Sequence, residues 1–91
     1  MKITRNVIQA CCGTTSLIFK ADGPLTIDFI KFLVNNGFAE LKNFTEAGIL
    51  YATNSYLIVT GPLGSDKLQV KCRKANCDQQ FNDFEVLLTN Y

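Results

Sequence analysis

The sequence predicts a single α+β domain, in which an antiparallel sheet of about five to six strands is covered on one face by two helices. Three observations predict this fold class. The chain has 91 residues, 47% of them apolar, which suits one compact domain over residues 1–91. Several short segments alternate apolar and polar residues, as strands do. Two longer segments space their apolar residues as a helix does, so the expected order is strand, strand, helix, four strands, helix.

The chain begins with two predicted strands and a turn between them. Residues 3–10 alternate loosely and have no cleanly apolar face, which is typical of an edge strand. Residues 12–14 have the composition of a turn. Residues 15–20 form the better strand, with Leu17 and Phe19 on one face.

A helix is predicted next. Pro24 suits a first helical turn, and Thr26 is an alternative N-cap. Gly37 supplies the left-handed stop. The apolar face comprises Phe29, Ile30, Leu33 and Val34, extended by Leu25 and Ile27.

Four strands should follow in a meander. They cover residues 39–44, 49–53, 56–60 and 67–73. Asn54 and Ser55 give a short hairpin turn. The glycine-rich loop 61–66 matches no phosphate-binding motif and leads into a strand, so it is predicted to be a hairpin connection.

The last segment, residues 78–90, is predicted to be a helix capped by Asn76 or Asp78. Its apolar stripe comprises Phe81, Phe84, Val86, Leu87 and Leu88. A strand over residues 84–88 is the alternative, because a short apolar run fits both periods.

Catalytic chemistry is constrained most by the absence of histidine from the chain. Histidine is the usual general base near neutral pH and the commonest metal ligand, so triads and histidine-bearing zinc sites are excluded. The carboxylates are scattered and form no paired-acid motif. We therefore predict no catalytic residues, no cofactor and no metal site, and expect the protein not to be an enzyme.

The composition also constrains location and partners. The formal net charge is +1, which lacks the bulk basic signature of nucleic-acid-binding domains. No apolar run approaches the roughly 20 residues that span a membrane. We expect a cytoplasmic protein without membrane contact, in a compartment where thiols stay reduced.

The cysteines, Cys11, Cys12, Cys72 and Cys77, do not have the spacing of paired zinc knuckles. For Cys72 and Cys77 the sequence leaves a disulfide and a metal half-site both open. Cys77 is also a candidate reactive thiol, because Arg73, Lys74 and a helix start near it would favour the thiolate.

The clearest charged cluster is the basic strand over residues 67–74, with Lys67, Lys71, Arg73 and Lys74. Alternation projects the first three from one face, where they can meet phosphates or an acidic partner. Tyr51 and Tyr56 on neighbouring strands can add stacking surfaces. An ordinary solvated sheet face is the simpler interpretation, since lysine also blocks edge-to-edge aggregation.

These patterns favour a small non-enzymatic protein that acts by contact with another protein or with itself as a homodimer. Inhibitors, subunits and accessory proteins of phages or mobile elements fit this description, and the Asn, Lys, Ile and Phe usage is compatible with an AT-rich genome. The alternative hypothesis is a nucleic-acid or small-ligand binding module that uses the basic strand.

Overall fold

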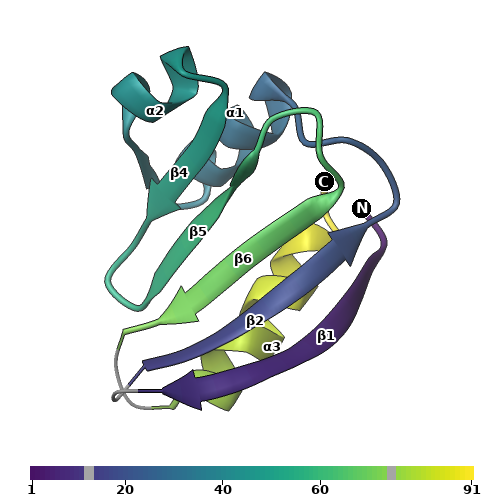
Figure 1. The fold of residues 1–91 in the computed structure, drawn as a ribbon, viewed down its shortest axis with the longest axis vertical. Helices are drawn as coiled ribbons and strands as arrows, with labels where there is room; N and C mark the ends of the chain where they lie inside the picture. Colours follow the sequence, from purple (N-terminus) through teal and green to yellow (C-terminus); the bar gives the residue numbers. More distant parts are fainter. Residues whose placement is uncertain (12–13, 74–75) are drawn as a thin grey trace.

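The computed structural model describes residues 1–11, 14–73 and 76–91, which form one six-stranded antiparallel sheet and three helices (Figure 1). The α+β prediction is confirmed. The elements are β1 (Ile3–Cys11), β2 (Thr14–Ala21), α1 (Ile27–Asn35), β3 (Ala39–Glu40), α2 (Lys42–Glu46), β4 (Ile49–Thr53), β5 (Leu57–Pro62), β6 (Lys67–Cys72) and α3 (Cys77–Leu88). The turn predicted at residues 12–14 lies largely outside the described residues.

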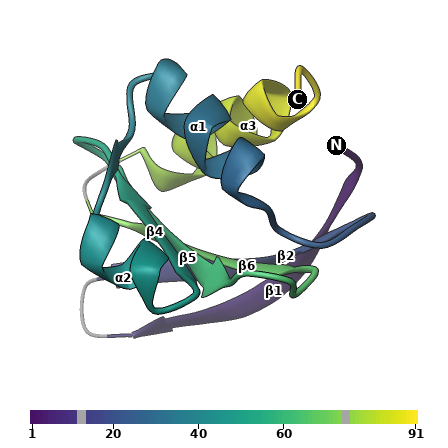
Figure 2. The same ribbon diagram turned by 90° about the horizontal axis from the view of Figure 1, so that it is seen from above.

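The strands lie in the order β1-β2-β6-β5-β4-β3. After the β1–β2 hairpin, α1 carries the chain to the far edge of the sheet, and the meander β3 to β6 returns to pair β6 with β2. Both long helices, α1 and α3, lie on the same face of the sheet (Figure 2). The opposite face of the central strands is covered by neither of these two helices, and the short helix α2 contacts it beside β4, where Phe44 stacks on Tyr51.

The core lies between the sheet and these two helices. Because side chains alternate along a strand, every second side chain points into this core. Examples are Phe19 of β2, Leu68 of β6 and Val59 of β5, which are all fully buried. Phe84 of α3 stacks on Phe19 with ring centroids 5.9 Å apart. Burial of this apolar set is the main force that holds the layers together.

Helix α1 begins and ends where its sequence predicts. The Thr26 hydroxyl accepts a hydrogen bond from the Phe29 N–H, as an N-cap does. Gly37 has a φ of 94°, the left-handed conformation that ends the helix. The buried face is Phe29, Ile30 and Leu33, whereas Val34 and Ile27, both predicted on this face, are exposed.

The last segment is a helix, which settles the ambiguity between helix and strand. Phe81, Phe84 and Leu88 face the core. Val86, predicted in the apolar stripe, is 64% exposed, because it lies on the opposite side of the helix from Phe84. Glu85 accepts a hydrogen bond from Arg5 Nε over 2.6 Å, which ties α3 to β1.

The strand predicted over residues 39–44 is wrong. Only Ala39 and Glu40 pair with β4, and residues 42–46 form the short helix α2, so the chain has a helix more than the two expected. Residues 39–42 alternate as a strand does, but Leu41 and Phe44 also have the i, i+3 spacing of a helix. In the structure the Phe44 N–H donates a hydrogen bond to the Leu41 carbonyl. Phe44 then stacks on Tyr51 of β4 at 4.9 Å.

Both predicted hairpin connections of the meander are present, but β5 continues to Pro62, so the second is shorter than the predicted loop 61–66. Asn54 Oδ1 accepts hydrogen bonds from the N–H groups of Tyr56 and Leu57, which closes the β4–β5 turn. The β5–β6 loop turns at Gly64, with a φ of 87°. The Gly64 N–H also donates to the carbonyl of Leu25, which fixes the chain before α1 against the loop.

Candidate functional site

The candidate site is the face of the sheet opposite α1 and α3, which we call the open face. Its residues are the outward positions of the four central strands: Ser16, Ile18 and Lys20 of β2, Lys67, Gln69 and Lys71 of β6, Ile58, Thr60 and Pro62 of β5, and Ile49, Tyr51 and Thr53 of β4. None is fully buried. The face mixes isoleucines with cations, unlike the uniformly apolar face beneath the helices.

The cations of the open face are unneutralised. Lys20 lies directly opposite Lys67 in the β2–β6 register, an unfavourable like-charge pairing. Lys71 lies opposite Ser16 on one side and Ile58 on the other. Within the described part of the chain, no ion pair or hydrogen bond involves the ammonium groups of these lysines. The open-face positions include no Asp or Glu.

Four of the eight carboxylates lie on the two helices that cover the other face of the sheet. Asp28 lies on α1, and Asp78, Asp83 and Glu85 lie on α3, with Lys31 as the basic residue on these two helices. Although the net charge is only +1, the two sides of the molecule therefore differ in charge. A small net charge does not prevent a local positive field of this kind.

Three members of the predicted basic cluster can be placed. Lys67 and Lys71 project from the open face as predicted. Arg73 follows β6, and its guanidinium donates to Thr53 Oγ1 over 3.4 Å. Lys74 lies outside the described residues. Sequence reasoning missed Lys20, although its outward position in the predicted strand 15–20 was a usable signal.

The two predicted tyrosines do not form one stacking platform. Tyr51 lies on the open face opposite Thr60, and the Phe44 ring stacks against it. Tyr56 lies in the β4–β5 turn, 43% exposed. Tyr56 therefore lies away from the row that contains Tyr51 and Gln69.

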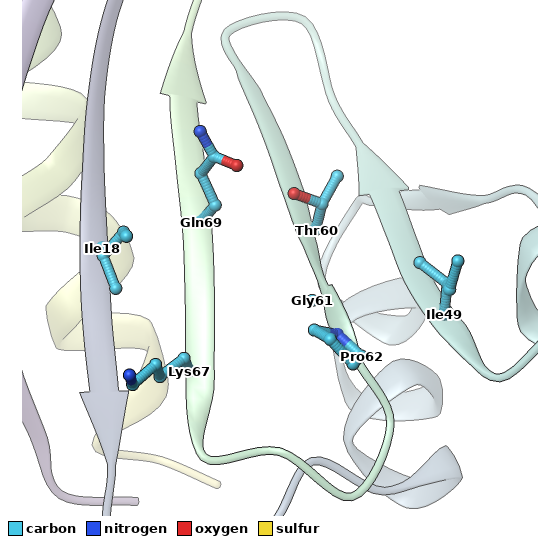
Figure 3. A pocket seen from close by; sticks show the side chains of 7 residues that line it. All are labelled: Ile18, Ile49, Thr60, Gly61, Pro62, Lys67 and Gln69. Carbon is cyan, nitrogen blue, oxygen red and sulfur yellow. The ribbon is translucent and has the colours of Figure 1, made fainter.

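The open face is hollowed towards the end at which β5 ends and β6 begins (Figure 3). The hollow, which we call the anchor pocket, has a volume of about 280 Å³. Figure 3 shows the Lys67 side chain extended from β6 towards β2, beside Ile18. The pocket is lined by Ile18, Ile49, Thr60, Gly61, Pro62, Lys67 and Gln69.

The anchor pocket arises where the paired ladder between β5 and β6 ends. The β5–β6 pairing ends at Thr60 and Gln69, whereas the β2–β6 pairing continues to Lys67. Pro62 has no N–H to donate, so it cannot extend the ladder towards β6. Gly61 has no side chain where this ladder ends, so its backbone lies close to that of Lys67, and Thr60 and Pro62 form the β5 wall of the hollow.

Cys72 and Cys77 form a disulfide between the end of β6 and the start of α3, with Cα atoms 5.6 Å apart. The sequence left a disulfide and a metal half-site open, and the structure has the disulfide. In this form Cys77, the candidate reactive thiol, has no thiol. Cys72 is 1% exposed, so the bridge anchors α3 to the core side of the sheet.

We expect reduction of this bridge to lower the free energy of unfolding by about 2 kcal/mol, the chain-entropy value for so short a loop. Urea unfolding with and without a dithiol reductant measures the change. The Cys77→Ala variant is the control, because it should respond little to reductant. If reductant lowers the free energy of unfolding equally in both proteins, the change comes from other cysteines and not from this bridge.

The described residues offer little else for catalysis or metal binding. Among them, no group of three His, Cys, Asp or Glu side chains lies close enough to hold a metal ion. Their buried side chains are all apolar, so none of their charged groups is desolvated in the manner typical of active sites. No helix in this part of the chain is long and apolar enough to cross a membrane.

Comparison with known proteins does not assign the site. The chain matches no protein-family model, no curated protein and no solved structure.

Proposed function

We propose that this protein is a non-enzymatic interaction protein, an accessory, inhibitor or subunit, which uses the open face to bind an acidic protein partner. The observation that carries the proposal is the combination of partly exposed isoleucines with the unneutralised Lys20, Lys67 and Lys71 on one face. Apolar residues supply binding energy at protein interfaces, and complementary charge supplies specificity and association rate.

Nucleic-acid binding through the basic strand is the second candidate, favoured by the same cations and the absence of carboxylates from the open-face positions. The aromatic residues favour a protein partner instead. Proteins that bind single strands on a sheet stack successive bases on aromatic rings. Here Phe44 already stacks on Tyr51.

Matched double variants test the proposal. Ile58 and Lys71 are cross-strand neighbours on the open face, away from the anchor pocket. We expect Ile58→Asp with Lys71→Glu to weaken the partner's binding at least about tenfold, through lost apolar contact and charge repulsion. The control, Val86→Asp with Lys31→Glu, makes the same chemical changes on the helices and should bind normally.

The measurement is capture of partners from an extract of the source cells by wild type and both double variants. The proposal is supported if one protein is recovered in a constant ratio to the bait with wild type and with the helix control, and is not recovered with the open-face variant. Equal recovery by all three, or loss with the helix variant alone, contradicts it.

Light scattering behind a size-exclusion column, in about 50 mM and about 500 mM salt, separates the other occupants. The ultraviolet absorbance ratio shows whether the protein carries nucleic acid. Nucleic acid that is bound at low salt and released at high salt would indicate that the open face binds phosphates and not a protein partner. A salt-independent dimer that the open-face variant breaks would make a second copy of the chain the partner.

The compartment and the origin are part of the proposal. In the cytoplasm, where we place the protein, Cys72 and Cys77 should be reduced, because disulfides are rare there. Alkylation of thiols in intact cells should then label both residues, whereas a protected pair would move the protein to an oxidising compartment. An origin in a phage or mobile element is supported by residue usage alone.

A further inference from the structure

We propose that the anchor pocket binds one apolar side chain of the partner with a carboxylate next to it. This inference rests on the proposed function and specifies the chemistry of its central contact. The occupant is an extended peptide segment of another protein in which a leucine-sized residue is flanked by aspartate or glutamate.

The open form of the pocket indicates a side chain and not an enclosed cofactor. Sites for drug-sized ligands have volumes of roughly 300–1,000 Å³ and enclose most of the ligand. The anchor pocket has a volume of about 280 Å³, close to the lower end of that range, but it opens onto the face and does not enclose a ligand. Surface pockets in protein interfaces commonly receive the anchor residues that dominate the binding energy.

The lining of the pocket indicates an apolar occupant. Ile18, Ile49 and Pro62 are the apolar side chains of the lining and come from three different strands. Pro62 and Ile49 are cross-strand partners, so this side of the pocket is fixed by the β4–β5 ladder. An apolar side chain that enters the pocket would bury apolar surface of the pocket and of the partner, which favours binding.

The charges around the pocket indicate a carboxylate beside that apolar group. Lys67 lines the pocket and Lys20 lies opposite it, and neither forms an ion pair with a carboxylate of the described residues. Asp22 and Asp66 line a separate hollow at the end of the sheet, which Lys20 also lines, so Lys67 is the cation at the pocket with no carboxylate lining beside it. Gln69 supplies an uncharged amide that can donate to the same carboxylate.

A second copy of this chain is a less suitable occupant. The acidic side of the chain exposes Val86, with Asp83 one turn before it, and also Ile27 beside Asp28. Insertion of either residue into the pocket of a neighbour would use two different surfaces of the molecule. Such a heterologous contact closes only into rings and otherwise produces filaments.

Three capped hexapeptides test the inference: one with a leucine between two aspartates, one with asparagines in place of the aspartates, and one with serine in place of the leucine. Binding is followed by amide shifts in ¹⁵N-labelled protein at peptide concentrations up to about 5 mM. We expect the first peptide to shift Ile18, Thr60 and Gln69 saturably. The asparagine peptide should bind at least about fivefold more weakly, since exposed charge pairs each contribute a factor of roughly two to five. The serine peptide should bind at least about fivefold more weakly because it loses the apolar group that enters the pocket.

Variants locate the contact. Lys67→Gln should weaken the first peptide about two- to fivefold, and Ile18→Ser should weaken it further. Lys31→Gln on α1 is the matched control and should leave binding unchanged. The spectra themselves report whether each variant is folded.

The inference is overturned if the asparagine peptide binds as well as the aspartate peptide, or if the shifts fall outside the pocket. It is also overturned if Lys67→Gln and Lys31→Gln behave alike. Its failure is distinguishable from failure of the proposed function, because the capture variants Ile58→Asp and Lys71→Glu lie outside the pocket. If those variants lose the partner but the peptides show no selectivity, the open face is still the binding surface and the anchor pocket is not its central contact.

Discussion

Phe19→Ala is expected to lower the free energy of unfolding by about 3–5 kcal/mol, the largest effect that we predict for a single substitution. Phe19 is completely buried in the middle of β2 and stacks on Phe84 of α3. Truncation removes its transfer free energy, leaves a cavity between sheet and helix, and breaks the aromatic pair. A domain of this kind has a total stability of roughly 5–15 kcal/mol, so a substantial fraction should be lost.

Urea unfolding followed by circular dichroism measures this loss. Phe44→Ala is the control with the same chemical change, because Phe44 is 40% exposed and contacts Tyr51 outside the core. Its cost should be about 1 kcal/mol. Equal losses for the two variants would mean that Phe19 is not the centre of the layer contact.

Gly61→Ala should destabilise the protein by about 1–3 kcal/mol, the second largest effect. A Cβ at this position would lie 2.7 Å from the backbone oxygen of Lys67 and 2.9 Å from Leu25 Cδ1. The Lys67 oxygen belongs to β6 and cannot move without the strand, so β5 must shift. The anchor pocket lies at this point, so the shift should also change its shape.

Gly23→Ala is the matched control for that variant. A Cβ on Gly23 would meet no atom within 4 Å, so the same change should be neutral or slightly stabilising. The comparison is made by urea unfolding at 25 °C. A neutral Gly61→Ala would contradict the close approach of β5 and β6 on which the pocket geometry depends.

The fold was largely predictable because its strands alternate clearly. Leu68 and Val70 against Lys67, Gln69 and Lys71 define both faces of β6, and burial follows that division residue by residue. The predicted helix at residues 78–90 was correct because Phe81, Phe84 and Leu88 have helical spacing. Val86 broke the pattern, since a stripe of consecutive apolar residues cannot all face one side of a helix.

The short helix α2 could not be predicted from local pattern. Residues 39–42 alternate as a strand does, but only Ala39 and Glu40 pair with β4. Because β3 is the edge strand in the order of the sheet, it is held by pairing on one side alone. The stacking of Phe44 on Tyr51, a tertiary contact, is part of the environment in which the helical turn forms. Tertiary context commonly overrides propensity in elements of this length.

The candidate site was predictable in part. The outward lysines of β6 followed from alternation alone. Their combination with Lys20 and Ile49 depends on sheet order, because β2 and β6 become neighbours only after the chain crosses the sheet through α1. The anchor pocket depends further on where the β5–β6 ladder ends, a feature of register that composition does not reveal.

Site-specific photo-crosslinking tests most directly the central claim that the open face binds a protein partner. A photoreactive residue replaces Gln69 at the centre of that face, or Asn82 on the exposed side of α3, in the cells from which the gene comes. We expect a discrete protein adduct from position 69 and none from position 82. Adducts from position 82 alone, or nucleic acid in place of protein at position 69, would contradict the account.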